Sequence, residues 1–248
     1  MIQQAIVTTS GDVLNVRSSP YGPVIDTVEP GTVVEVIGTP VPQGGLTWVP
    51  IGGDRWVSRE FLTVHNPTTE TDDHLANTIG GPKIVATQTQ ETIAGGLKVY
   101  HTELFDAGGW LVNTVRCISG RIGQQTPSDQ PGSQTPIPFG VYTFDIPGSV
   151  EYAGGEFGGV WSAVTPTFET DRGGFGVHYD PSVFKDNEET GTAGCLATPT
   201  IEERDLMTDF IRTHAPTHLI IQPQLIDNGP ITDPSERQSS GPVGVPED

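Results

Sequence analysis

The first part of the chain alternates short apolar stretches with turn residues. The stretches are Val13–Val16, Val24–Val28, Thr32–Ile37, Trp48–Ile51 and Arg55–Val57. β-Branched residues, which favour strands, fill much of the third stretch. Gly52-Gly53-Asp54, between the last two, is typical of a hairpin turn. Five short strands over so few residues predict a small barrel.

Apolar and polar residues alternate again after Ile79. The alternating stretches lie at 83–86, 97–100, 110–115, 140–144 and 174–178. A period of two is the mark of a strand with one buried face. The second part of the chain is therefore also predicted to consist mainly of strands. The segment 124–138 is rich in turn formers and predicts a long loop, which in a compact domain is usually functional or mobile.

One segment carries the pattern of a helix. Thr200 and Glu203 match a capping box at its start. Two apolar pairs follow at helical spacing: Leu206 with Phe210 and Met207 with Ile211. Pro216 limits the helix, and 218–222 reads as a closing strand. We expect this to be the one substantial helix of the second domain.

Two polar segments without periodicity divide the chain. Residues 66–78 are interpreted as a linker, and the acidic, Gly- and Pro-rich residues 228–248 are expected to have no fold of their own. This predicts a small module at 1–65 and a larger domain at 79–227, both mainly β. The 31 glycines and 22 prolines agree with that fold class, because these residues interrupt helices.

The charge balance excludes two classes of partner. The chain has 12 Lys and Arg against 31 Asp and Glu, a formal net charge of −19 at pH 7. So acidic a surface repels phosphate backbones and anionic lipid headgroups, and neither nucleic acid nor a membrane is expected as a partner. No apolar run reaches the ~20 residues that a membrane-spanning helix needs.

Cysteine is the strongest nucleophile among the side chains when its surroundings lower the thiol pKa. Cys195 follows Gly191-Thr192-Ala193-Gly194, whose small residues allow a tight turn that presents N–H groups to a developing oxyanion. His178 ends an apparent strand 17 positions earlier, so a return loop can bring its imidazole to the thiol. These two residues are the candidate nucleophile and base.

Several motifs of the first region occur in a characteristic order. They are Gly11–Pro20, Glu29–Thr32, Trp48, Arg55–Ser58 and Phe61-Leu62. In this order they resemble bacterial SH3-like (SH3b) domains over nearly the whole segment. The resemblance implies a module that binds cell-wall peptide or glycan, with Tyr21 and Trp48 as exposed aromatic contacts. The alternative for Trp48, Trp56 and the Arg17 stem is packing inside the barrel.

Three motifs of the second region are Thr135–Tyr142, Gly176–His178 and Gly191–Leu196. In order and spacing they resemble L,D-transpeptidase domains of the YkuD type, over about residues 80–222. The resemblance implies that Cys195 takes up an acyl group from a peptidoglycan stem peptide. It implies further that His178 accepts the thiol proton and later activates water or an amine.

The same resemblance implies supporting roles around the cysteine. The backbone carbonyl of Tyr179 would orient the imidazole of His178. The backbone N–H groups of Gly194 and Cys195 would form the oxyanion site, and Thr192 would line the substrate site. The reaction implied is an acyl transfer that needs no cofactor.

Two positions depart from the family pattern. Ala193 stands where a histidine usually precedes the Gly-Cys pair. Leu196-Ala197-Thr198 lacks the arginine that usually follows the cysteine and holds the substrate carboxylate. Hydrolysis of the stem peptide therefore stays open beside transpeptidation. A structural or assembly protein that has kept the fold without turnover is a further alternative.

Cys117 is the rival nucleophile. The segment Arg116–Gly120, with His178 downstream, is faintly similar to NlpC-type cysteine peptidases, whose nucleophile begins a helix. Gly120–Gly123 would make a poor helix, so we interpret Cys117 as a buried strand residue. A disulfide between Cys117 and Cys195 is not expected, because it would remove the thiolate and the chain shows no export signal.

No metal site is expected either. The remaining histidines are His65, His74, His101, His214 and His218, and they show no ligand spacing with cysteines or acids. His214 and His218 lie four positions apart, but Pro216 between them prevents a shared helix face.

The first ten residues contain neither a basic start nor the apolar core of a signal peptide. Peptidoglycan lies outside the membrane, so we expect a phage-encoded protein: a lysin, or a virion-associated protein with other virion proteins as partners. Its place would be the virion, or the host cytoplasm before lysis. The alternative is a bacterial L,D-transpeptidase of the periplasm or cell wall whose signal was removed.

Overall fold

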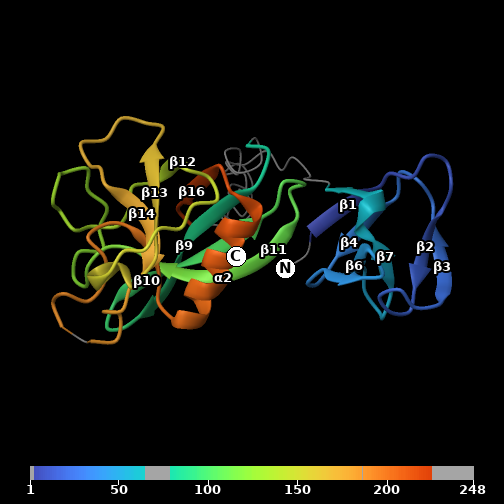
Figure 1. Cartoon of the computed structure of the whole chain (residues 1–248), viewed down its shortest axis with the longest axis horizontal. Coiled ribbons are helices and arrows are strands. Elements are labelled where there is room, and N and C mark those ends of the chain that lie inside the picture. The colour runs from blue at the N-terminus through green and yellow to red at the C-terminus, as the bar shows by residue number, and fades with distance from the viewer. Residues whose placement is uncertain (1–2, 65–78, 186, 225–248) are drawn as a thin grey trace, which may run out of the picture.

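The computed structural model describes residues 3–64, 79–185 and 187–224. The predicted linker at 66–78 and the predicted tail at 228–248 lie outside these ranges. The described residues form a mainly β protein with one α-helix, as the sequence predicts. They are divided into an N-terminal region and a larger C-terminal barrel that lie side by side (Figure 1).

The N-terminal region, residues 3–64, consists of two antiparallel sheets around one core. The first has the order β4-β1-β8 and the second the order β3-β2-β7-β6-β5. The elements are β1 (Gln3–Val7), β2 (Leu14–Arg17), β3 (Val24–Val28), β4 (Val33–Val36), β5 (Val41–Gln43), β6 (Leu46–Pro50), β7 (Trp56–Ser58), the 3₁₀ turn η1 (Arg59–Phe61) and β8 (Leu62–Val64). Ala5, Val16 and Val57 are fully buried in the shared core.

The sequence pattern predicts five of these strands and misses β1, β5 and β8. β5 and β8 have only three residues each, too few positions to establish a period. In β1 the residue between the buried Ala5 and Val7 is Ile6, which is also apolar and hides the alternation. β5 also contains Pro42, which argues against a strand except at a sheet edge, where β5 lies. The predicted turn between β6 and β7 is confirmed, with φ of 94° at Gly52 and 54° at Asp54.

The C-terminal barrel closes from eight strands in the order β10-β11-β15-β14-β13-β12-β16-β9. Neighbouring strands are antiparallel except for the parallel pairs β14–β15 and β16–β9. The strands are β9 (Lys83–Ile93), β10 (Leu97–Phe105), β11 (Leu111–Ile118), β12 (Gly140–Phe144), β13 (Trp161–Pro166), β14 (Phe175–Tyr179), β15 (Leu196–Thr198) and β16 (His218–Gln222). β16 is the predicted closing strand.

Alternation in the sequence misses β13 and β15 for two different reasons. In β13 the buried positions include Ser162, whose hydroxyl donates to Ser149 O, so the polar side chain lies inside. In β15 all three residues are buried, and no alternation exists to be found.

Helix α2 (Ile201–His214) begins at the predicted cap. Thr200 Oγ1 accepts the N–H of Glu203 at 3.2 Å and donates to the Glu203 carboxylate at 2.8 Å. The helix ends at His214, and the residue after it, Ala215, has a left-handed φ of 47° and is followed by Pro216. No helix among the described residues is long and apolar enough to cross a membrane.

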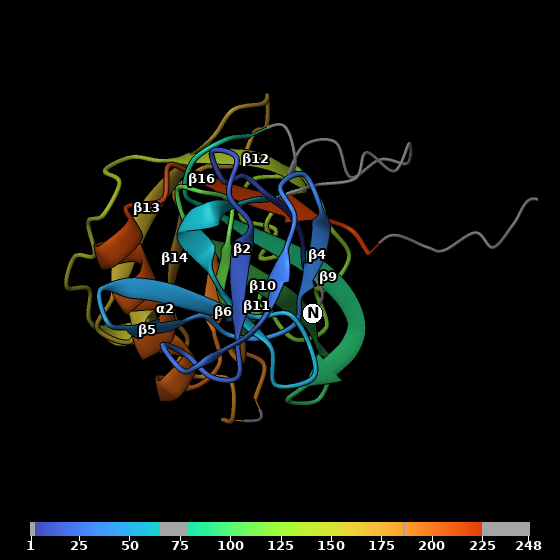
Figure 2. The ribbon, with the colours of Figure 1, turned by 90° about the vertical axis from the view of Figure 1, so that its right-hand side faces the viewer.

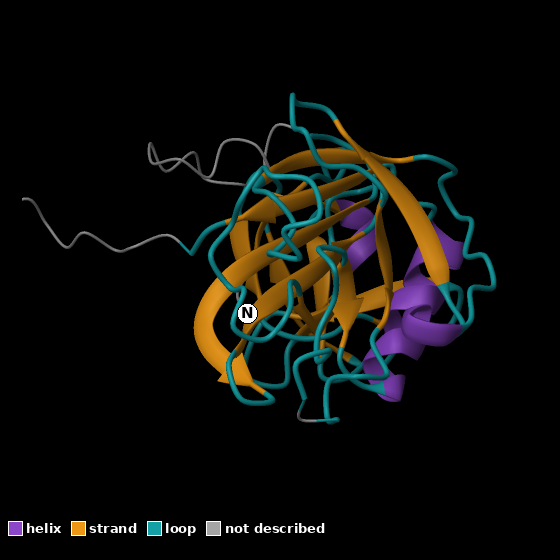
Figure 3. Ribbon diagram, turned by 90° about the vertical axis from the view of Figure 1, so that its left-hand side faces the viewer, coloured by secondary structure: helices purple, strands orange, loops and turns teal. Residues whose placement is uncertain are grey.

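One face of α2 covers the outside of the barrel beside β11, β14 and β15 (Figure 3). Met207, Phe210 and Ile211 are buried on this face. Leu206, which the sequence pairs with Phe210, is exposed instead, because it lies on the solvent side of the helix. The apolar face of α2 that packs against the strands is therefore narrower than the sequence predicts.

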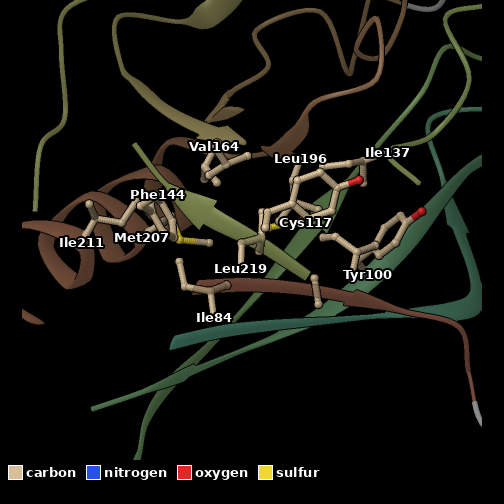
Figure 4. Close-up of a cluster of buried hydrophobic side chains, with 14 of the residues drawn as sticks. Ile84, Tyr100, Cys117, Ile137, Phe144, Val164, Leu196, Met207, Ile211 and Leu219 are labelled. Carbon is tan, nitrogen blue, oxygen red and sulfur yellow. The ribbon is translucent and has the colours of Figure 1, made fainter. Parts of the chain in front are cut away.

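The core of the barrel lies between strands that are far apart in the sequence (Figure 4). Tyr100 from β10, Cys117 from β11 and Leu219 from β16 point into it, and all three are fully buried. Met207 of α2 extends the same cluster from outside the strands. The predicted strand position of Cys117 is confirmed.

A turn of the barrel contacts the N-terminal region directly. Trp110, in the turn between β10 and β11, is buried in the N-terminal core cluster. The Arg59 guanidinium lies 5.1 Å from the Trp110 ring and forms an ion pair with Asp106. Gln3 donates to Gly109 O at 2.9 Å. Seen from that side, the N-terminal sheets stand in front of the barrel (Figure 2).

Candidate active site

The parallel pairing of β14 and β15 brings the candidate nucleophile and base together. His178 lies on β14 opposite Ala197, and Cys195 immediately precedes β15. The thiol therefore lies beside Gly176, whose backbone N–H interacts with it. His178 is two residues further along the same strand, and its side chain and Cys195 line one cavity.

The His178 ring is held in one orientation. Its Nδ1 lies 2.9 Å from Tyr179 O, the contact that the sequence predicts. A carbonyl only accepts, so Nδ1 carries the proton and Nε2 is left as the basic nitrogen. Phe157 meets the ring edge-on at 5.2 Å, and Trp161 lies 6.0 Å from it on the neighbouring strand.

Cys195 is 8% exposed, and its thiol donates to Gly174 O at 3.7 Å. Burial raises the pKa of Cys195 to about 11, although the N–H of Gly176 favours the thiolate. Burial lowers the pKa of His178, and the Tyr179 carbonyl offsets part of this effect. At neutral pH the thiol of Cys195 and the imidazole of His178 are therefore both uncharged.

A cavity of about 270 Å³ opens onto both groups. Its walls are the segment around Gly132, the glycines before β14 and the loop that ends at Cys195. Glu156 and Asp171 place carboxylates on its lining. The Glu156 charge raises the pKa of Cys195, while the 3.6 Å ion pair of Glu156 with Arg121 partly neutralises that charge.

Thr192 and Gly194 stabilise the loop before Cys195. Thr192 Oγ1 accepts the N–H groups of Gly120 at 3.0 Å and Gly194 at 3.1 Å, and it donates to Cys195 O at 2.8 Å. Thr192 lines the cavity, but its hydroxyl is engaged by the backbone. The Gly194 N–H is engaged as well, which corrects its predicted place in the oxyanion site. Cys195 N–H is the remaining member of the predicted oxyanion pair.

Arg172 is the residue that sequence reasoning missed. It comes from the loop between β13 and β14, and its guanidinium is buried against the Cys195 loop, donating to Ala193 O at 3.5 Å. Nothing in the sequence near Arg172 marks it, because its partners lie between 21 and 44 positions away. Phe157 and Trp161 are also absent from the sequence prediction.

The two aromatic residues predicted to contact the cell wall, Tyr21 and Trp48, differ in their exposure to solvent. Tyr21 is 60% exposed, as expected. Trp48 is only 3% exposed, because its indole packs under the Arg17 guanidinium at 5.4 Å and donates from Nε1 to Gln43 O. The prediction that Trp48 is an exposed contact is wrong. Its ring instead lines a second cavity of about 250 Å³, together with Asn15.

Comparison of the chain with protein-family models, with curated proteins and with solved structures finds no match in any of the three. Within the described ranges, no three His, Cys, Asp or Glu side chains are grouped closely enough to hold a metal ion. The geometry of the cavity and the motifs in the sequence are therefore the observations that bear on function.

Proposed function

We propose that the chain is a peptidoglycan-acting cysteine enzyme of the L,D-transpeptidase type, with an SH3-like module that binds the cell wall. One observation carries the proposal. A cysteine and a histidine from adjacent parallel strands open onto one cavity, and a backbone carbonyl fixes the histidine with Nε2 free as a base. Pairing of a thiol with an oriented imidazole is the arrangement that acyl transfer through cysteine requires.

In the first half-reaction, Cys195 Sγ attacks the carbonyl carbon of a stem-peptide amide as its proton passes to His178 Nε2. The oxyanion that forms is stabilised by the Cys195 N–H. Collapse breaks the C–N bond, and the leaving amine takes the proton back from Nε2. The product is a thioester on Cys195.

In the second half-reaction, an amine or a water molecule attacks the thioester and gives a proton to His178 Nε2. The C–S bond then breaks, and the sulfur of Cys195 recovers that proton. An attacking amine gives a new cross-link, whereas water gives a trimmed stem. The acidic lining from Glu156 and Asp171 supports a substrate group with a positive charge near the reaction centre.

Purified sacculi test this function. After incubation with the full chain, we expect mass analysis of the released muropeptides to show either new cross-links or shortened stems. Cross-links would assign a transferase and shortened stems a hydrolase. Unchanged muropeptides, from protein that is folded by circular dichroism, would overturn the enzyme proposal and favour a structural role.

The wall-binding role is tested separately with the full chain that carries Cys195→Ala, because this variant is expected to bind sacculi without cleaving or cross-linking them. It should sediment with sacculi, and Phe61→Ala should weaken this, because Phe61 is exposed and lines the second cavity. Tyr21→Ala is the matched comparison, because Tyr21 is an exposed aromatic residue that does not line that cavity. Weakening by Phe61→Ala assigns binding to the cavity, and weakening by Tyr21→Ala assigns it to Tyr21. Full binding by both variants would contradict wall binding by this region.

A further inference from the structure

Arg172 bridges two loops at the candidate nucleophile. Its Nη1 donates to Pro136 O at 2.7 Å, Ser128 O at 3.0 Å and Thr135 Oγ1 at 3.1 Å. Its Nη2 donates to Thr135 O at 2.9 Å and to Ala193 O at 3.5 Å. One side chain thus joins the long loop before β12 to the loop that ends at Cys195.

The backbone beside Cys195 is shaped around this guanidinium. A Cβ at Gly194 would collide with Arg172 Nη2, and Gly194 has a φ of +121°, which side chains rarely tolerate. Glycine is therefore required for two reasons at the position directly before the nucleophile. The cation lies against the main chain of the reactive loop.

The charge of Arg172 has no ionic partner in the described part of the chain. The ion pairs found there involve Arg55, Arg59, Arg116, Arg121 and Arg204. Arg172 is 9% exposed, and neutral carbonyls surround it. A buried cation without a carboxylate is costly for the fold. An anion that appears only during the reaction would offset this cost.

We propose that Arg172 is a positioning residue for Cys195: it fixes the reactive loop, and its buried charge stabilises the Cys195 thiolate. Both hydrogens on each Nη are engaged by the protein, so neither Nη is available to bind a substrate carboxylate. The proposal rests on Cys195 being the nucleophile. Burial lowers the pKa of Arg172, and interactions with Tyr142, Asp129 and Cys195 partly reverse this.

Other charged or titratable groups act on the same pair. The charge of Glu156 acts on the thiol of Cys195, and His178 and Asp171 line the same cavity. Tyr142 and Asp129 interact with the charge of Arg172. Asp180 acts on His178, and Arg121 pairs with Glu156. Glu156 opposes the thiolate, and Arg172 is the buried group that favours it through charge. Removing the Arg172 charge should therefore change the titration of Cys195 in one direction only.

The test is the pH dependence of Cys195 alkylation by iodoacetamide in the full chain, followed by peptide mass analysis. It needs no wall substrate, so its failure is distinct from failure of the proposed function. Arg172→Met should move the alkylation midpoint upward by one pH unit or more, which is about a tenfold slower reaction at a fixed pH. Arg212→Met, which removes an exposed positive charge from α2, is the matched control and should leave the midpoint unchanged.

Arg172→Lys separates charge from loop geometry. It keeps the cation but cannot bridge five acceptors, so the midpoint should stay near that of the unchanged chain while turnover on sacculi falls. A folded Arg172→Met protein with an unshifted midpoint would overturn the charge role. If both variants unfold, the proposal is also overturned, because Arg172 would then be a residue of the fold rather than of the reaction.

Discussion

Cys117 lies in β11 and Cys195 immediately precedes β15, and these two strands pair through Ile118 and Ala197. Their surroundings nevertheless differ. Cys117 is fully buried among apolar side chains, and burial raises its pKa to about 12 (Figure 4). Cys195 faces a cavity, with a pKa of about 11 that burial again raises.

Burial therefore does not distinguish the two thiols, because it opposes ionisation of both. The difference lies in what is arranged around the sulfur. The backbone N–H of Gly176 and the charge of Arg172 act on Cys195, and Cys195 shares an open cavity with an oriented imidazole. Cys117 does not line that cavity, and its sulfur packs in the hydrophobic core. The groups around a thiol, and the access of substrate to it, therefore decide whether it can act as a nucleophile.

The largest expected effect comes from removing each sulfur in turn. Cys195→Ala should abolish wall turnover, because no other group can carry the acyl intermediate. Cys117→Ala should leave turnover close to that of the unchanged chain. Muropeptide analysis of both variants checks this. An active Cys195→Ala protein, or an inactive but folded Cys117→Ala protein, would reverse the assignment.

Loss of the base should be the next largest effect. His178→Gln removes the group that accepts the thiol proton, and turnover should fall by about 10²- to 10⁴-fold. The matched change His214→Gln, on α2, should have little effect, because that imidazole stacks on Phe210 instead. Initial rates on sacculi give the comparison. Equal losses from the two histidines would contradict the role of His178.

Alkylation should also separate the two thiols in the folded chain. Cys195 should react more than about 100-fold faster than Cys117, which becomes accessible only when the barrel opens. Because the thiolate is the reactive form, the Cys195 rate should rise about tenfold per pH unit and level off near pH 11. If the alkylation rate of Cys195 levelled off below pH 8, the thiolate would already be formed at neutral pH. That result would contradict the conclusion that the thiol is uncharged there.

The smallest effect concerns stability. Cys117→Ala leaves a small void in the core and should lower the free energy of unfolding by about 1 kcal/mol. Cys195→Ala should lower it less, because its sulfur already faces the cavity. Urea denaturation of the two variants measures the difference. A larger loss from Cys195→Ala would mean that this sulfur, too, serves mainly to fill the fold.

The sequence predicts those parts of the site that depend on neighbouring residues. Cys195, His178 and the Tyr179 carbonyl lie within short motifs, and so does the Thr200 cap of α2. Arg172 is invisible at that level, because strand pairing and loop folding bring its partners to it. The same holds for the burial of Trp48 under Arg17.

The fold, too, has features that depend on neighbouring residues and features that depend on residues far apart in the sequence. Alternation finds strands with one apolar face, but it cannot find β13, where Ser162 turns inward, or the closure of the barrel itself. The contact of Trp110 with the N-terminal core is likewise absent from any local pattern. These features depend on contacts between residues far apart in the sequence. Local patterns in a single sequence do not show which distant segments will pair.

The central claim is that Cys195 carries the acyl group of a stem peptide. The most direct measurement is mass analysis of the full chain quenched in acid during turnover on muropeptides with intact stems, followed by peptide mapping. The account predicts a thioester adduct on the peptide that contains Cys195, and none on the one that contains Cys117. Turnover without an adduct on Cys195, or with an adduct on Cys117, would contradict it.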